Sequence, residues 1–436
     1  MSPLTRRQLL LAGAATAASA AAGRAFGAPR TGPASVPTGQ LPRPSASGIE
    51  QIVVVCMENR SFDHYLGWLP GANGRQAGLS YPDDKGVMHP THHLTEWQGC
   101  SFNDPDHSYE GGRVQLNGGA CDGFRKGSND DFALGYYTKD DLPLYSKFVE
   151  QTTVFDQWFA SILSSTYPNR FYTHAARTDR IDNATRTTSL PTIWDRLSAA
   201  GVPATYYFSD LPFLVLWGEK YVGISRHVDT FFADALAGRL APFSYLDPYF
   251  LGEDQGGSND DHPHADIRRG QAFLSLVATA IANSPQWKST ALVITYDEWG
   301  GFFDHVVPPV LPDDHVTVGS EYDHSQAGFR VPSFVFSPFA RRGGIDHHMY
   351  DHTSILKFVE WRFGLGALSA RDRSARNLAH ALDFAKPDFS VPAVPLVTDP
   401  GPHVCGAPSG PMALEEPFWL GLKEKAYGMP GWRQLL

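Results

Sequence analysis

Positive charge is scarce in this chain of 436 residues, in which 36 Lys and Arg stand against 46 Asp and Glu and give a formal net charge of −10. Proteins that bind nucleic acid build their affinity from Lys and Arg contacts to phosphate, so this balance argues against a nucleic-acid partner. It also argues against electrostatic docking on anionic lipid, although transient contact with a zwitterionic membrane surface stays open.

Cysteine is rare as well, with four residues in the whole chain. Their spacing matches no zinc ribbon. Cys100 and Cys121 flank a loop-like segment and could pair in an exported protein, whereas Cys56 ends an apolar run and is expected to be a buried thiol. We expect no function to depend on these residues.

Three common catalytic signatures are missing from the sequence. The absence of a Gly-x-Ser-x-Gly elbow argues against a standard α/β-hydrolase esterase. The absence of His-Glu-x-x-His argues against a zincin protease, and the absence of a Gly-x-x-x-x-Gly-Lys loop argues against a P-loop nucleotide site.

Beyond its first residues the chain has no apolar stretch of the roughly 20 residues that a membrane-spanning helix needs. At its start, Arg6 and Arg7 precede an uncharged run rich in Ala and Leu over 9–22. This pattern predicts a twin-arginine signal peptide over 1–28, with an uncleaved membrane anchor as the alternative. The Pro- and Gly-rich residues 29–48 predict a flexible spacer. We therefore expect a periplasmic, cell-wall-associated or secreted protein.

The remaining chain, 49–436, alternates continuous β-branched runs with segments of helical periodicity. The runs over 51–57 and 291–296 predict strands that are buried on both faces, and 266–282 is the clearest amphipathic helix. The alternation predicts an α/β fold, a three-layer sandwich with a mainly parallel central sheet. We expect a single domain whose last part, from about 366, wraps the core.

Acidic residues follow both buried strands directly, as Glu58-Asn59 and Asp297-Glu298. In open α/β sheets ligands bind at the carboxyl ends of the strands, and carboxylate oxygens suit a divalent cation. Crowded carboxylates repel each other without a cation, so this pattern predicts a metal site whose ion the sequence does not identify. An acid after a strand is also commonly a helix cap or a salt-bridge partner, which is the alternative.

Hydroxyl side chains precede a predicted helix in the segment 164–170, Ser-Ser-Thr-Tyr-Pro-Asn-Arg. The N-terminus of a helix attracts anions, and a hydroxyl there beside a cation could ionise and attack phosphorus. Arg170 could hold a phosphate oxygen with two hydrogen bonds. The alternative is that the Ser or Thr only caps the helix.

Histidine is abundant, with 17 residues, many of which stand next to Asp. Histidine can transfer protons near neutral pH and can donate to phosphate oxygens. Adjacent residues on an extended chain point in opposite directions, so such a pair is not automatically an interacting dyad.

Together, five segments resemble the motifs of the bacterial phospholipase C and acid phosphatase family, which is similar to plant non-specific phospholipase C. They are residues 58–67, 104–109, 165–170, 259–263 and 296–306. The last of these, Tyr-Asp-Glu-Trp-Gly-Gly-Phe-Phe-Asp-His-Val, matches the family's most specific stretch. Relatives commonly have His after this Glu, where this chain has Trp299, and the change bears on substrate choice. The resemblance spans about 49–365.

The resemblance implies a fold akin to alkaline phosphatases and sulfatases, with Thr166 as the nucleophile. It implies a divalent metal ion with the ligands Glu58, Asn59, Thr166, Asp297 and Glu298. Roles in proton transfer or phosphate binding would fall to His107, His262 and His305. Asn169 and Arg170 are expected to bind the substrate phosphate.

These observations predict an exported, metal-dependent phosphoester hydrolase. We expect a phospholipase C that cleaves lipids such as phosphatidylcholine, to diacylglycerol and a phospho-head-group, through a phospho-threonine. The alternatives are an acid phosphatase that acts on small phosphomonoesters and a non-catalytic surface protein that binds metal or phosphate. The apolar run 213–217 could line a lipid pocket, or it could be part of the core.

Overall fold

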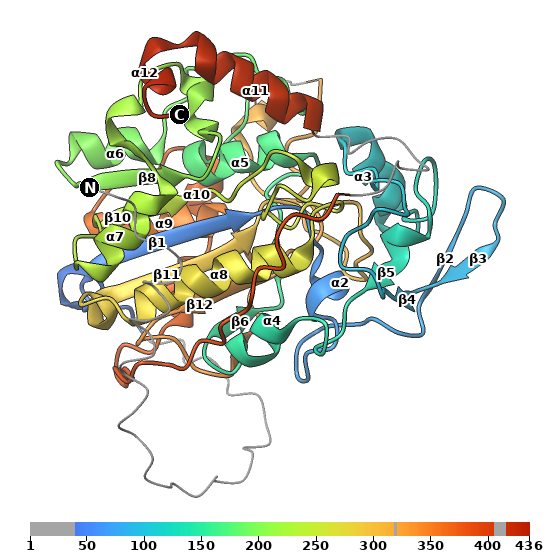
Figure 1. Cartoon of the computed structure of the whole chain (residues 1–436), viewed down its shortest axis with the longest axis horizontal. Helices are drawn as coiled ribbons and strands as arrows, with labels where there is room; N and C mark the ends of the chain where they lie inside the picture. Colours follow the sequence, from blue (N-terminus) through green and yellow to red (C-terminus); the bar gives the residue numbers. More distant parts are fainter. Residues whose placement is uncertain (1–39, 318–320, 405–415) are drawn as a thin grey trace, which may run out of the picture.

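The computed structural model describes residues 40–317, 321–404 and 416–436. The predicted signal peptide over 1–28 and most of the spacer over 29–48 lie outside these residues. The described part of the chain is built around one large sheet with helices against both faces (Figure 1).

The central sheet has eight strands in the order β13-β6-β12-β11-β1-β10-β8-β9. In this order their bounds are Gly344–Asp346, Thr153–Phe155, Ser333–Phe336, Thr290–Tyr296, Gln51–Met57, Phe243–Leu246, Ala204–Phe208 and Ser225–His227. Strand β1 pairs in parallel with β11 and β10, and the pairs β10–β8, β8–β9 and β13–β6 are also parallel. Strand β12 runs antiparallel to β11 and β6. The predicted α/β class with a mainly parallel sheet is confirmed.

Helices make the sheet the middle layer of three (Figure 1). On one face α8 packs against α4 and α7, and on the other α5 packs against α6 and α9. The bounds of these helices are Ile267–Ala282 for α8, Pro143–Phe148 for α4, Val228–Leu236 for α7, Thr166–Ala175 for α5, Ile193–Ala199 for α6 and Thr353–Phe363 for α9. This is the predicted three-layer arrangement.

The two central strands, β1 and β11, are buried along their whole length. Layers on both faces remove every side chain from water, which explains why both strands are continuous apolar runs rather than alternating ones. Helix α8 starts where the periodicity predicts, because the side chain of Asp266 accepts a hydrogen bond from the backbone N–H of Arg268.

The apolar run 213–217 belongs to the core. It forms a 3-10 helix whose side chains are at most 4% exposed. The rings of Phe213 and Trp217 pack against Phe171 of α5. A lipid-binding surface has to be accessible. The interpretation of this run as part of the core is therefore the correct one.

Smaller elements surround the sheet. Three two-stranded sheets pair β2 with β3, β4 with β5, and β7 with β14, with bounds Ser80–Pro82, Met88–Pro90, His92–His93, Gly135–Tyr136, Trp158–Phe159 and Tyr350–Asp351. The remaining α-helices of the described chain are α2 Phe62–Leu66, α3 Tyr109–Leu116, α10 Ala370–Ser374, α11 Glu416–Gly428 and α12 Pro430–Arg433. Helix α11 packs against the 3-10 helix at 213–217, and its Trp419 stacks on Phe250 at 4.1 Å between ring centroids.

The pairing of Cys100 with Cys121 is wrong. Cys121 is a buried free thiol that packs in a small apolar cluster with Tyr81 and Phe124, whereas Cys100 is disulfide-bonded and lies in a different neighbourhood beside Trp97. Cys56 is a buried free thiol, as predicted. Within the described ranges, none of the helices combines the length and the apolarity needed to cross a membrane.

Candidate active site

The acids that follow the two central strands meet at one edge of the sheet. Because β1 and β11 are parallel neighbours with Met57 opposite Tyr296, Glu58 and Asp297 leave the sheet side by side. The backbone N–H of Asp297 donates to the carbonyl of Met57 at 3.1 Å. Glu58, Asp297 and their successors in the chain are all fully buried.

A tight backbone turn brings Asn59 close to the chain after Glu298. Asn59 has a φ of +58°, in the left-handed region that Asn tolerates better than most residues. Gly300 passes so near that a Cβ there would lie 2.2 Å from the Asn59 carbonyl oxygen. Glycine is therefore required at position 300 for the two strand ends to approach each other.

Thr166 lies next to this edge as the first residue of α5, after the N-cap Ser165. Its buried hydroxyl donates to Asn59 Oδ1 at 3.3 Å. Asn169 holds the turn in place, since its Nδ2 donates to the carbonyls of Ser164 and Ser165 at 2.7 and 3.1 Å. The fold thus brings a hydroxyl, a helix N-terminus and the acidic strand ends together, as the sequence predicted.

Arg170 ties the acids to one another. Its guanidinium contacts Asp297 at 2.9 Å, Asp247 at 2.8 Å and Glu58 at 3.3 Å, and it also donates to the last two carbonyls of β1. The side chain is fully buried. Each of its three nitrogens has a protein partner, and Asn169 is bonded to the backbone. The sequence suggested that both residues bind the substrate phosphate. In the structure, both instead hold neighbouring protein groups in position.

Two further groups of potential metal ligands adjoin the strand ends. In each group one ligand atom per residue lies within 4.8 Å of the others, and the groups are Glu58, Glu253 and Asp260, and Asp104, His107 and His262. They are connected, because His262 Nδ1 lies 2.9 Å from Glu253 Oε2. His107 Nδ1 lies 2.6 Å from Glu298 Oε1 and so joins the second group to the end of β11.

Burial governs the charges in this region. It raises the pKa of Asp260 well above its ordinary value and lowers the pKa of His262 well below its own. Crowded, buried carboxylates are stable only when paired or bound to a cation, and Arg170 alone cannot balance them. The donor set of carboxylate oxygens with nearby imidazoles therefore fits a divalent metal ion, whose identity the geometry does not determine.

His305 is placed elsewhere. Its Nδ1 lies 2.5 Å from Asp63 Oδ2, and Arg330 reaches both Asp63 and Asp304 at 3.0 Å. Arg330 supplies the charge that balances these two acids. In the part of the chain described here, the structure brings His107 and His262 to the acidic strand ends but gives His305 no contact with them or with Thr166.

Sequence reasoning missed Glu253 as a potential metal ligand. It lies in a 3-10 turn, Glu253–Gln255, within a Gly-rich loop that has no periodicity and no motif. Asp104 and Asp260 were inside recognised segments but were not singled out. Glu253 is recognised only from its contacts in space, with His262 and with the group of Glu58 and Asp260. Such proximity cannot be seen in the sequence.

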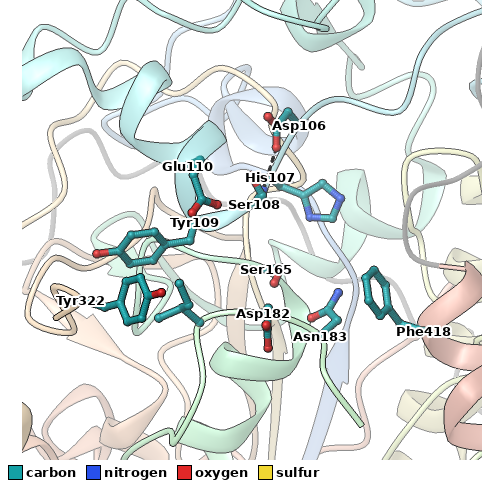
Figure 2. Close-up of a pocket in the computed structure, with 11 residues that line it drawn as sticks. Asp106, His107, Ser108, Tyr109, Glu110, Ser165, Asp182, Asn183, Tyr322 and Phe418 are labelled. Atoms are coloured by element: carbon teal, nitrogen blue, oxygen red, sulfur yellow. Dashed lines mark hydrogen bonds between the residues drawn. The ribbon is translucent and has the colours of Figure 1, made fainter. Parts of the chain in front are cut away.

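A pocket of about 340 Å³ opens at Ser165, the residue before Thr166 (Figure 2). His107 and Ser165 line it and connect it to the buried residues described above. Its outer wall includes Tyr109, Tyr322 and Phe418. The pocket thus extends from solvent to Ser165, the neighbour of Thr166, whose own side chain is fully buried.

Comparison with known proteins gives consistent matches. A family model described as "Phosphoesterase family" matches residues 49–366. Non-specific phospholipase C1 of Arabidopsis thaliana is 32% identical over 385 residues, which cover 76% of this chain and 70% of that protein. Phospholipase C A of Mycobacterium tuberculosis (strain ATCC 25618 / H37Rv) is 30% identical over 415 residues, with 78% of each chain covered.

Solved structures show a weaker likeness. The lipoteichoic acid synthase LtaP from Listeria monocytogenes has a TM-score of 0.42 and 8% identity, over 78% of this chain and 77% of that one. A protein in the alkaline phosphatase superfamily from Vibrio parahaemolyticus has a TM-score of 0.35 and 12% identity, over 54% of this chain and 63% of that one. At these scores the likeness says nothing about chemistry, and the fold class rests on the sheet itself.

Proposed function

The chain belongs to the Phosphoesterase family, and we propose that this phosphoric ester hydrolase works as an exported, metal-dependent phospholipase C. Its substrates would be phospholipids such as phosphatidylcholine, cleaved to diacylglycerol and a phospho-head-group. The relatives named phospholipase C support the phosphodiester substrate. Residues Arg6 and Arg7 before an apolar run support export by the twin-arginine route.

One observation carries the chemistry: the hydroxyl of Thr166 stands at the N-terminus of α5, bonded to Asn59 and beside the buried acids. We propose that Thr166 loses its hydroxyl proton to the histidines at the strand ends, that Oγ1 attacks phosphorus, and that the bond from phosphorus to the glycerol oxygen breaks. The helix N-terminus stabilises the phosphoryl oxygens. Water then releases the phospho-head-group from Oγ1 and regenerates the hydroxyl.

Proton transfer falls to the two histidines at the strand ends. His107 is held by Glu298 at the end of β11, and its proposed part is to protonate the departing glycerol oxygen. His262 is held by Glu253 and stands in a T-shaped contact with His107, at 5.7 Å between ring centroids. His305 has no direct part in this proposal.

The metal would be held by Glu58, Asn59, Asp297 and Glu298 together with Thr166, and Glu253 and Asp260 extend this set. A divalent cation bound there would lower the pKa of the hydroxyl and offset the charge of the phosphoryl group. All other steps are assigned to side chains of this chain.

The test is phosphorus release by the purified mature protein, with phosphatidylcholine vesicles and p-nitrophenyl phosphate assayed side by side, with and without a chelator. Phosphocholine release that is lost on chelation is the expected result. Cleavage of the monoester alone would make the protein a phosphatase. No turnover of either substrate by metal-replete protein would contradict the mechanism itself.

A further inference from the structure

The pocket at Ser165 carries negative charge. Asp106, Glu110 and Asp182 line it, and no Lys or Arg does so in the described ranges, although Arg186 pairs with Asp182 at 3.8 Å from outside the lining. Glu110 and Asp182 are exposed to solvent. An anionic group that entered this pocket would meet like charges on its walls, whereas a cation would be attracted.

The same pocket offers aromatic faces. Figure 2 places Tyr109 and Tyr322 on one side and Phe418 on the other, with Asp182 and Asn183 between them. Tyr322 is 43% exposed and Phe418 is 39% exposed, so both rings are accessible to a ligand in the pocket. Quaternary ammonium groups are typically recognised by aromatic side chains of this kind.

The ring of Tyr109 already has a cation on one face. The guanidinium of Arg113 lies 3.1 Å from the ring centroid of Tyr109 and donates to the backbone carbonyls of Tyr109, Leu163 and Asp323. Arg113 does not line the pocket. The faces left for a ligand are therefore those of Tyr322 and Phe418.

The direction of the reaction decides which half of a phospholipid enters. When Thr166 attacks phosphorus and diacylglycerol leaves, the head group stays attached through phosphorus to Oγ1. The pocket is lined by Ser165, the neighbour of Thr166, and by His107, so it offers the head group space next to the nucleophile. Diacylglycerol is apolar and uncharged, so the carboxylates that line the pocket would not stabilise it.

We propose that this pocket selects phosphodiesters with a cationic head group, with Glu110, Tyr322 and Phe418 as its specificity-determining residues. The inference rests on the proposed function and adds a preference to it, although relatives carry the name "non-specific". Phe418 belongs to α11, beyond residue 366 where the family match ends, so the family model does not supply this wall.

Two soluble substrates isolate the charge. In p-nitrophenyl phosphorylcholine and the p-nitrophenyl diester of 3,3-dimethylbutanol, the leaving group and shape are the same, but carbon replaces the charged nitrogen. We expect the wild-type enzyme to prefer the choline diester roughly tenfold in kcat/KM. Raising the ionic strength should reduce this preference.

Variants then test the residues. Glu110→Gln and Phe418→Leu should each reduce the ratio of kcat/KM for the choline diester to kcat/KM for the uncharged diester several-fold. Glu150→Gln is the matched control, because Glu150 is exposed and lies outside the pocket. Equal hydrolysis of the two diesters by the wild-type enzyme, or equal loss of both in the variants, would overturn the inference.

A binding measurement separates this inference from the proposed function. Calorimetric titration of the full mature chain with choline, and with 3,3-dimethylbutanol, requires no turnover. Choline binding that weakens several-fold in Glu110→Gln supports the pocket even if neither diester is cleaved. The lack of cleavage would then contradict the proposed function alone. Absence of choline binding in a catalytically active enzyme would overturn the pocket assignment alone.

Discussion

At the scale of single residues, Thr166 combines the features of an activated nucleophile. Its side chain is buried, its hydroxyl is bonded to Asn59, and it starts a ten-residue helix. A hydroxyl that only capped the helix would bond to the backbone ahead of it, but the N-cap here is Ser165, which makes no such side-chain bond.

Replacing Thr166 with Ala should therefore remove turnover and leave the fold intact. We expect kcat for p-nitrophenyl phosphorylcholine to fall by roughly three orders of magnitude or more, because no other hydroxyl bonds to Asn59 in the described structure. Thr166→Ser is the matched control and should keep substantial activity. Turnover like that of the wild type in Thr166→Ala would contradict the assignment.

Glu253 gives a second test, because nothing in the sequence pointed to it. It lies within 4.8 Å of ligand atoms of Glu58 and Asp260 and also contacts His262. Glu253→Gln should lower the metal content per chain, measured by elemental analysis after gel filtration, since a carboxylate is replaced by a neutral amide. Glu219→Gln, away from this group, is the control. Unchanged metal content in Glu253→Gln would exclude this residue as a ligand.

At the scale of elements, the C-terminal helix α11 reaches the site from outside the matched family segment. Glu416 at its start accepts hydrogen bonds from the backbone N–H groups of Gly252 and Glu253. Two residues later, the Phe418 carbonyl accepts a hydrogen bond from the hydroxyl of Tyr167, the neighbour of Thr166. Helix α11 is thus tied to both sides of the candidate active site.

Glu416→Ala should consequently disturb the loop that carries Glu253. We expect a loss of roughly 10- to 100-fold in activity or metal affinity, as is typical when a support behind a ligand is removed. Added metal should restore part of the activity, which a general folding defect would not allow. Glu424→Ala on the same helix is the control. A loss of activity that excess metal does not change would contradict this positioning role.

Helix α9 carries a carboxyl that should make stability depend on pH. Burial, together with a hydrogen bond and charge repulsion from Asp372, raises the pKa of Glu360 to about 9. In the unfolded chain this group ionises near its ordinary value of 4.5, so the folded state holds a proton that the unfolded state has released. Its contribution to stability is complete below pH 4.5 and is lost as pH rises towards 9.

Glu360→Gln mimics the protonated carboxyl and should remove this dependence. We expect the melting temperature of the wild type to fall relative to that of Glu360→Gln as pH increases from 5 to 9. Thermal unfolding at several pH values measures the difference. A constant difference between the two proteins across this range would mean that Glu360 has an ordinary pKa in the folded chain.

At the scale of the whole molecule, the chain combines a net charge of −10 with an expected export signal and a deeply buried site. The twin-arginine proposal is tested by Arg6→Lys combined with Arg7→Lys. We expect the full-length precursor to stay in the cytoplasm, because the export route recognises the paired arginines. Cell fractionation measures this. Arg30→Lys combined with Arg43→Lys is the control. Normal export of the first variant would contradict this route.

The sequence alone determined the class of fold and the edge of the sheet at which the site lies. Strands β1 and β11 and helix α8 were predictable because periodicity and burial are local properties of the chain. The acids after the strands and the hydroxyl at the start of α5 followed in turn, because parallel strands place their carboxyl ends at one edge. The helix that carries Tyr109 was not predicted, since its Gly111 and Gly112 weaken the helical signal.

Only the tertiary structure decided how the side chains are used. Arg170 turns towards Asp297 and Asp247 rather than towards the pocket, and His305 pairs with Asp63, because partners more than 75 residues away in the chain determine these contacts. Glu253 and Phe418 join the site through loops and a helix that carry no motif. Such positions depend on long-range packing, which one sequence does not encode in any local pattern.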